Sequence, residues 1–139
     1  RNYGQELCLP ESWAQYNLVS EFFTRSFNSK SPVHYGNISV RGENIYNTIG
    51  FLNRLWSYGA DIFDLDGNLT IHSPNAVTAL RNYIKSFQYS NPDRNINSWD
   101  AAVEEYCKGD TAMAVFMIPT RCGSMIIRNP KWQEILAVL

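Results

Sequence analysis

Apolar residues recur at helical intervals in the first half of the chain. The segment 9–27 carries six of them on one side of a helix of roughly four turns: Trp13, Tyr16, Val19, Phe22, Phe23 and Phe27. The segment 41–60 repeats the pattern with Ile45, Ile49, Leu52, Leu55 and Trp56. Gly42 lies just before this second helix and Gly59 just after it, where glycine is a good terminator. Two amphipathic helices are therefore predicted here.

Two further helices begin with recognisable capping residues. Ser73 is an N-cap and Pro74 follows at the first helical position, where its missing N–H costs nothing. Val77, Leu80, Ile84 and Phe87 then lie on one face of that helix. Ser98 caps a fourth helix, which Gly109 ends.

Two segments are typical of strands. The segment 33–40, "VHYGNISV", is short, β-branched and aromatic, and 111–118, "TAMAVFMI", is a nearly continuous apolar run consistent with burial on both faces. Asp66 and Gly67 join two short apolar pieces and predict a hairpin turn. Together with the four helices, these strands predict a helix-rich α/β fold.

Composition narrows the class of protein. The chain has 139 residues, a length that suits about one domain, with 45% hydrophobic and 18% charged residues. The net charge is −1 and no run of Lys or Arg occurs, so neither nucleic acid nor an anionic membrane is a favoured partner. No apolar run is long enough to span a bilayer. The start at Arg1, without Met, and the apolar end "EILAVL" lead us to expect a piece of a longer protein.

No residue cluster predicts a metal, a cofactor or catalysis. Asp61, Asp64 and Asp66 fail the EF-hand spacing, because placing Gly67 at position six leaves no ligand at positions one or twelve. A solvated hairpin turn is the better interpretation. Glu104 and Glu105 are adjacent on a helix and point to different sides, and the histidines His34 and His72 lack triad partners. The cysteines Cys8, Cys107 and Cys122 show no metal spacing; buried thiols are favoured, and a Cys107–Cys122 bridge is the alternative in a secreted chain.

The unusual feature is the aromatic content of 14%. Aromatic side chains at cleft edges stack on the apolar faces of sugar rings, while amides, carboxylates and guanidinium groups bind hydroxyls. The turn 41–47, "RGENIYN", offers this mixture, and so does 117–124, "MIPTRCGS". Each is also compatible with an ordinary loop followed by a helix start.

Five blocks of the sequence follow one another in order: "PESWAQY", "FNSKSPVHYG", "LWSYGADIFDLDG", "SPNAVTALRNY" and "WDAAVEEYCKGDTAM". In this order they are similar to bacterial extracellular solute-binding proteins of family 1, the sugar-binding receptors of ABC importers. Two departures are Ala60, where the family usually has a second glycine, and the absence of a Trp in "FMIPTRCGS".

The resemblance implies a class II fold of the periplasmic-binding-protein type, of which this chain would be mainly the second, C-terminal-type lobe. Residues 1–9 would connect from the first lobe, 10–125 would form the core of the second, and 126–139 would lead back. The implied function is capture of a sugar or oligosaccharide in an interlobe cleft and its delivery to the permease subunits of an ABC importer. The implied protein is a monomer without enzymatic activity or cofactor, periplasmic or lipid-anchored outside the cytoplasmic membrane.

The residues that would face such a cleft come from the two mixed turns: Arg41, Glu43, Asn44, Tyr46, Asn47, Met117, Thr120 and Arg121. Tyr46 would stack on a sugar ring, the neighbouring amides and Glu43 would bind hydroxyls, and Arg121 would take a hydroxyl or a carboxylate. Two alternatives remain open. One is a carbohydrate-active enzyme domain, which needs two carboxylates across a cleft, and the other is an interaction module without a small ligand.

Overall fold

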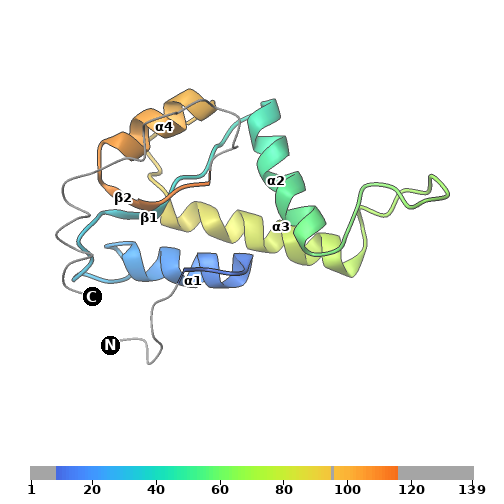
Figure 1. Cartoon of the computed structure of the whole chain (residues 1–139), viewed down its shortest axis with the longest axis horizontal. Coiled ribbons are helices and arrows are strands. Elements are labelled where there is room, and N and C mark those ends of the chain that lie inside the picture. The colour runs from blue at the N-terminus through green and yellow to red at the C-terminus, as the bar shows by residue number, and fades with distance from the viewer. Residues whose placement is uncertain (1–8, 95, 116–139) are drawn as a thin grey trace.

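A computed structural model describes residues 9–94 and 96–115, and within them four α-helices flank a two-stranded parallel sheet (Figure 1). The elements in chain order are α1 (Trp13–Phe23), β1 (Tyr35–Asn37), α2 (Ile45–Ser57), α3 (Pro74–Ser86), the 3-10 helix η1 (Phe87–Tyr89), α4 (Trp99–Cys107) and β2 (Thr111–Met113). The predicted small, helix-rich α/β domain is confirmed at this level. Within the described part, no helix is long and apolar enough for a membrane span; the longest have 13 residues, against about 20 for a span.

The predicted helix boundaries rest on capping groups that the structure shows. Ser73 Oγ accepts the Ala76 N–H of α3 at 3.4 Å, and Ser98 Oγ accepts the Ala101 N–H of α4 at 3.1 Å. The predicted first helix is too long, because α1 ends at Phe23. Thr24 follows in an extended conformation, and its hydroxyl donates to a carbonyl of the last turn, which ends the helix.

The two strands run parallel, with Tyr35 opposite Thr111 and Asn37 opposite Met113. In Figure 1, α4 lies above this sheet, and α3 and α1 lie below it. The approach of α1 to β1 depends on Gly36, since a Cβ there would lie 1.8 Å from the Ser20 carbonyl oxygen. The expected burial of β2 on both faces holds only in part: Thr111 is buried, whereas the residues after it are partly exposed. Residues 116–118 of that apolar run lie outside the described residues.

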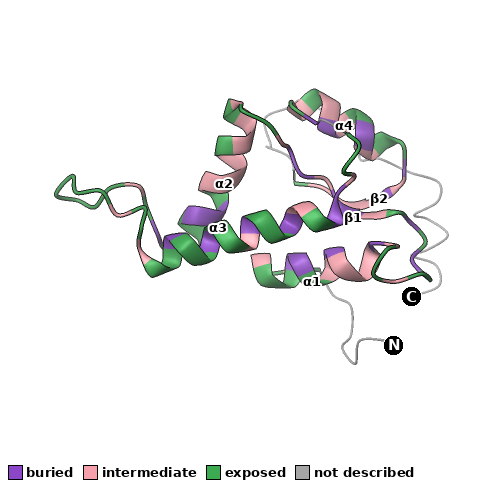
Figure 2. Cartoon of the chain, turned by 180° about the vertical axis from the view of Figure 1, so that it is seen from behind, coloured by how far each residue is buried: buried purple, intermediate pink, exposed green. Residues whose placement is uncertain are grey.

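The face of α3 that packs against the rest of the protein is formed by small and polar residues. Ala76, Ala79, Tyr83 and Ser86 are buried, and the small side chains of the alanines and the serine allow α1 and α2 to approach closely. The predicted apolar face is instead open on the side shown in Figure 2, with Val77 39%, Leu80 44% and Ile84 54% exposed. The helix was therefore predicted correctly, and its apolar stripe is not its buried face.

The aspartate-rich segment 61–72 is a hairpin turn that projects from the body of the domain (Figure 1). Phe63 and Leu69 form an antiparallel bridge, and Gly67 adopts a positive φ of 82°. The Asp64 carboxylate accepts hydrogen bonds from the Asn68 side chain and from backbone N–H groups of the turn, which lower its pKa. The interpretation as a turn is confirmed, and the described residues contain no cluster of metal-binding side chains.

Cys107 is a free thiol at the surface, so the expectation of a buried side chain is wrong at this position. It is the last residue of α4, at the end that faces solvent. Cys8 and Cys122 lie outside the described residues, as do most of the predicted connecting segments 1–9 and 126–139.

Candidate functional site

The turn 41–47, which connects β1 to α2, uses its amide side chains to hold its own backbone. Asn44 is the N-cap of α2: its Oδ1 accepts the Asn47 N–H and its Nδ2 donates to the Arg41 carbonyl, each at 3.0 Å. The Asn47 side chain donates to the Gly42 carbonyl at 3.0 Å and accepts the Tyr83 hydroxyl at 2.6 Å. Both amides therefore already have partners within the chain.

Arg41 joins the turn to the end of α3. Its Nη2 donates to the Phe87 carbonyl at 2.6 Å and to Ser90 Oγ at 2.7 Å, and its guanidinium lies 5.4 Å from the centre of the Phe87 ring. A cation at this point also complements the negative end of the helix dipole. Glu43 is exposed and forms no hydrogen bond or ion pair with the described residues.

Tyr46 differs from the rest of the turn, because it lines a cavity of about 130 Å³. Ile38, Ser39 and Val40, which follow β1, and Val115, which follows β2, also line it. The cavity therefore lies at the carboxyl ends of the parallel strands, where ligands of α/β proteins commonly bind. Its aromatic walls come from four helices: Trp13, Tyr16, Tyr46, Tyr83 and Trp99.

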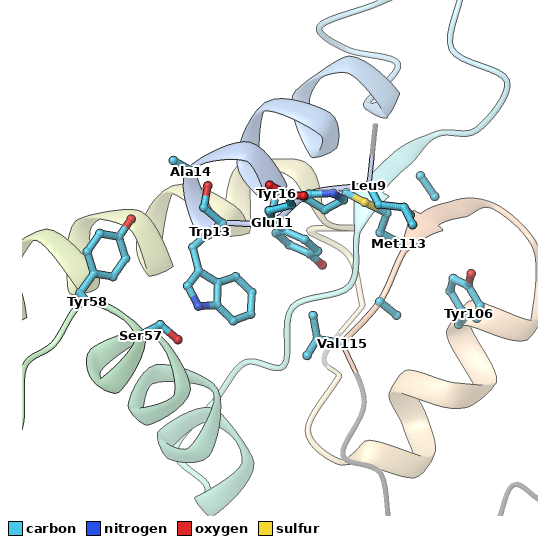
Figure 3. A pocket seen from close by; sticks show the side chains of 14 residues that line it. Leu9, Glu11, Trp13, Ala14, Tyr16, Ser57, Tyr58, Tyr106, Met113 and Val115 are labelled. Atoms are coloured by element: carbon cyan, nitrogen blue, oxygen red, sulfur yellow. The ribbon is translucent and has the colours of Figure 1, made fainter. Parts of the chain in front are cut away.

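A wider open cleft of about 800 Å³ adjoins this cavity and shares Trp13, Tyr16 and Val115 as walls. Figure 3 shows the Trp13 and Tyr16 side chains of α1 in the centre of the cleft, with Tyr58 at the end of α2 on one side and Val115 on the other. Aromatic surface thus continues from the small cavity into the cleft.

Arg54 of α2 is the charged residue of the small cavity. It is 6% exposed, and its guanidinium carbon lies 4.0 Å from the centre of the Trp13 ring and 4.8 Å from that of Tyr83. Its Nε donates to Asn82 Oδ1 at 3.3 Å and its Nη1 to the Gly50 carbonyl at 3.4 Å, both uncharged acceptors. Burial lowers the pKa of Arg54.

The pKa values of two tyrosines next to this guanidinium are shifted in the opposite direction, upward. Burial raises the pKa of the Tyr16 hydroxyl well above its ordinary value of 10.0, and it raises that of Tyr83 as well. The positive charge of Arg54 acts against both shifts but is the smaller effect. The hydroxyls are therefore neutral at physiological pH, and that of Tyr83 already donates to the Asn47 side chain.

The indole of Trp99, at the first position of α4, supplies an unused donor. Its Nε1 is buried and has no hydrogen-bond partner within the described part of the chain. The ring packs edge-to-face against Tyr46, with 6.0 Å between ring centres. A buried donor without a partner is unfavourable, and an acceptor on a ligand would satisfy it.

Sequence reasoning located the region of the cavity but not most of its walls. Of the predicted residues, Tyr46 lines it, whereas Arg41, Glu43, Asn44 and Asn47 line neither the cavity nor the cleft. The predicted residues of the second turn lie outside the described residues: Met117, Thr120 and Arg121. The missed walls are Trp13, Tyr16, Arg54, Tyr83 and Trp99. A usable signal was present, since Trp13 and Trp99 each follow a serine N-cap directly.

Comparison of the sequence with protein-family models and with curated proteins gives no significant match.

Proposed function

We propose that this chain is one lobe of an extracytoplasmic solute-binding receptor that captures a sugar or oligosaccharide and delivers it to an ABC importer. The lobe would be the C-terminal-type lobe of a class II periplasmic-binding-protein-like fold. The observation that carries the proposal is the convergence of separate motif blocks on one cavity. Trp13 comes from "PESWAQY", Tyr83 from "SPNAVTALRNY" and Trp99 from "WDAAVEEYCKGDTAM", and all three line it.

The chemistry of these walls suits a saccharide. Aromatic rings present apolar faces to the C–H surfaces of a sugar, and Trp99 Nε1 and Asn53 offer polar groups for hydroxyls. The cleft of about 800 Å³ lies within the size range of ordinary ligand sites, roughly 300–1,000 Å³. In the proposed receptor this surface is one wall of an interlobe cleft, and hinge closure brings the second wall over the ligand.

The two alternatives receive different support. A retaining or inverting glycosidase needs two carboxylates across its cleft. In the part of the chain that the structure describes, Glu11 is the one acidic residue that lines either the cavity or the cleft. The interaction-module alternative is favoured by the exposed apolar stripe of α3, which consists of Val77, Leu80 and Ile84. Such an open apolar surface suits a protein partner better than a small ligand.

The proposal is tested by titrating the chain with mono- and oligosaccharides at up to tens of millimolar. Tryptophan fluorescence and melting temperature are followed, because a ligand that binds only the folded state raises the melting temperature. Trp13 and Trp99 line the cavity, whereas Trp56 is exposed and does not. The expected result is a saturable change for at least one saccharide, kept in Trp56→Phe and lost in Trp13→Ala.

A flat response to every saccharide, in both fluorescence and melting temperature, would contradict the receptor proposal. A change that survives Trp13→Ala and disappears in Trp56→Phe would place sugar binding elsewhere on the surface. Far-UV circular dichroism of each variant shows whether the fold is kept.

A further inference from the structure

Arg54 is a buried positive charge that has no negatively charged partner among the described residues. Buried arginines are normally paired with a carboxylate, since an uncompensated charge is costly to remove from water. Arg54 is 6% exposed, and within the described part of the chain no Asp or Glu forms an ion pair with it. Among the described residues, its guanidinium lies against two aromatic rings and donates to two neutral oxygens.

The surroundings of Arg54 favour a negative charge in the cavity. No acidic residue of the described part lines it. Tyr46 and Trp99 lie in the first turns of α2 and α4, helices of 13 and 9 residues, whose N-terminal ends carry partial positive charge. Trp99 Nε1 adds a buried donor without a partner, and a donor can bind an anionic oxygen but cannot bind a cation.

The size of the cavity limits what it holds. A volume of about 130 Å³ corresponds to about four water molecules, which is enough for an acidic group and too little for an oligosaccharide. The adjoining cleft of about 800 Å³ has room for sugar rings and shares the Trp13 and Tyr16 walls. A ring in the cleft can therefore place one substituent in the cavity.

We propose that the ligand is an acidic saccharide, whose carboxylate or phosphate group binds Arg54 and Trp99 Nε1 while its ring stacks in the cleft. This inference rests on the proposed receptor function and specifies its class of ligand. A charge-assisted hydrogen bond in a desolvated site contributes enough to make the acidic sugar bind about tenfold or more tightly than its neutral parent.

The test is a ¹H–¹⁵N NMR titration of the chain, which detects binding even in the millimolar range. The probes are D-glucuronate, D-galacturonate and D-mannuronate, each with its neutral hexose, together with glucose 6-phosphate and inorganic phosphate. The expected result is that at least one acidic sugar shifts the Arg54 Nε–Hε signal and binds about tenfold or more tightly than its neutral parent.

The other outcomes contradict the acidic-ligand inference alone, the receptor proposal as well, or the saccharide nature of the ligand. Equal binding of neutral and acidic sugars, with the Arg54 signal unmoved, overturns the acidic-ligand inference and leaves the receptor proposal standing. No binding of any sugar overturns both. Inorganic phosphate that binds as tightly as glucose 6-phosphate shows a bare anion site and overturns the saccharide part.

Variants separate a ligand-binding role of Arg54 from a packing role. Arg54→Gln is expected to lose the preference for the acidic sugar, and Arg54→Lys to keep part of it, because lysine retains the charge without the planar fork. Arg81→Gln is the matched control, since Arg81 is exposed on α3. A preference that persists in Arg54→Gln overturns the inference. If Arg54→Gln does not fold, the role of Arg54 in acidic-sugar binding is judged from two other results. These are the wild-type titration and the comparison of Arg54→Lys with Arg81→Gln.

Discussion

The turn 41–47 and the aromatic cavity beside it both lie at the carboxyl ends of the parallel strands, yet the amides of the turn and the donors of the cavity differ in their partners. In the turn, the amides of Asn44 and Asn47 bind the chain itself. In the cavity, Trp99 Nε1 has no partner and Arg54 no counter-charge within the described residues. The difference teaches that polar composition alone does not mark a binding site. A polar group left without a partner by the fold is the more informative sign where its residue also lines a cavity, as Trp99 does.

The largest expected loss of stability comes from a substitution in the turn. Arg41→Ala removes two hydrogen bonds from a guanidinium to the end of α3, so the free energy of unfolding should fall by about 2–3 kcal/mol. Urea denaturation measures this loss. Arg81→Ala, on the exposed face of α3, should change stability by less than about 0.5 kcal/mol. Equal effects of the two substitutions would show that Arg41 does not hold the turn in place.

Alkaline pH should act through the tyrosines of the cavity, since the amides of the turn do not titrate. The raised pKa of Tyr16 means that the folded state keeps this proton when the unfolded chain, with an ordinary value of 10.0, loses it. This contribution is fully present below pH 10 and is lost as the pH rises further, about 1 kcal/mol by pH 11. Tyr83 acts in the same direction.

The measurement for this second prediction is the free energy of unfolding at pH 9 and pH 11 for the wild type and Tyr16→Phe. The variant lacks the titrating hydroxyl and should lose less stability over this range. An identical loss in both proteins would mean that Tyr16 is not buried as described.

A smaller loss of stability is expected when the N-cap of α2 is removed. Asn44→Ala removes the side chain that accepts the Asn47 N–H, and loss of an N-cap costs about 1 kcal/mol. Glu43→Ala, one residue earlier and exposed, is the matched control and should leave stability within about 0.5 kcal/mol of the wild type. Thermal unfolding of the pair distinguishes a capping role for Asn44 from a role in ligand binding alone.

The smallest effect on stability is expected in the cavity. Trp99→Phe keeps an aromatic ring against Tyr46 and deletes a buried donor that has no partner among the described residues, so the free energy of unfolding should change by less than about 1 kcal/mol. Affinity for a bound saccharide should fall about tenfold, because a ligand oxygen loses its donor. Unchanged affinity in a folded variant would remove Trp99 from the proposed site.

Elements with local signals were the predictable part of the fold. Ser73–Pro74, Ser98 and the turn at Gly67 mark their boundaries by short-range chemistry, and the structure shows the corresponding caps and turn. The buried face of α3 was not predictable from its apolar stripe. The helices α1 and α2 pack on α3, and Ala76 and Ala79 are buried there. Which face of α3 is buried therefore depends on contacts between segments far apart in sequence.

The candidate site was predictable only as a region. The strand-to-helix turn was identified, and Tyr46 lines the cavity. The amides of the turn were expected to bind a ligand, but a sequence does not show which of its polar groups are already satisfied by the backbone. Arg54 was missed for the converse reason, because in the sequence it resembles any solvated arginine on a helix and only the fold buries it between two rings.

The central claim is that the aromatic cavity and its adjoining cleft bind a saccharide. Its most direct test is the set of indole N–H signals in ¹H–¹⁵N spectra of the chain during titration with saccharides, neutral and acidic. Of the four tryptophans, Trp13 and Trp99 line the cavity, Trp56 is exposed outside it and Trp132 lies outside the described residues. Saturable shifts are therefore expected for the Trp13 and Trp99 signals, with the Trp56 signal unmoved. Indole signals that stay unmoved with every saccharide, or a shift confined to Trp56, would contradict it.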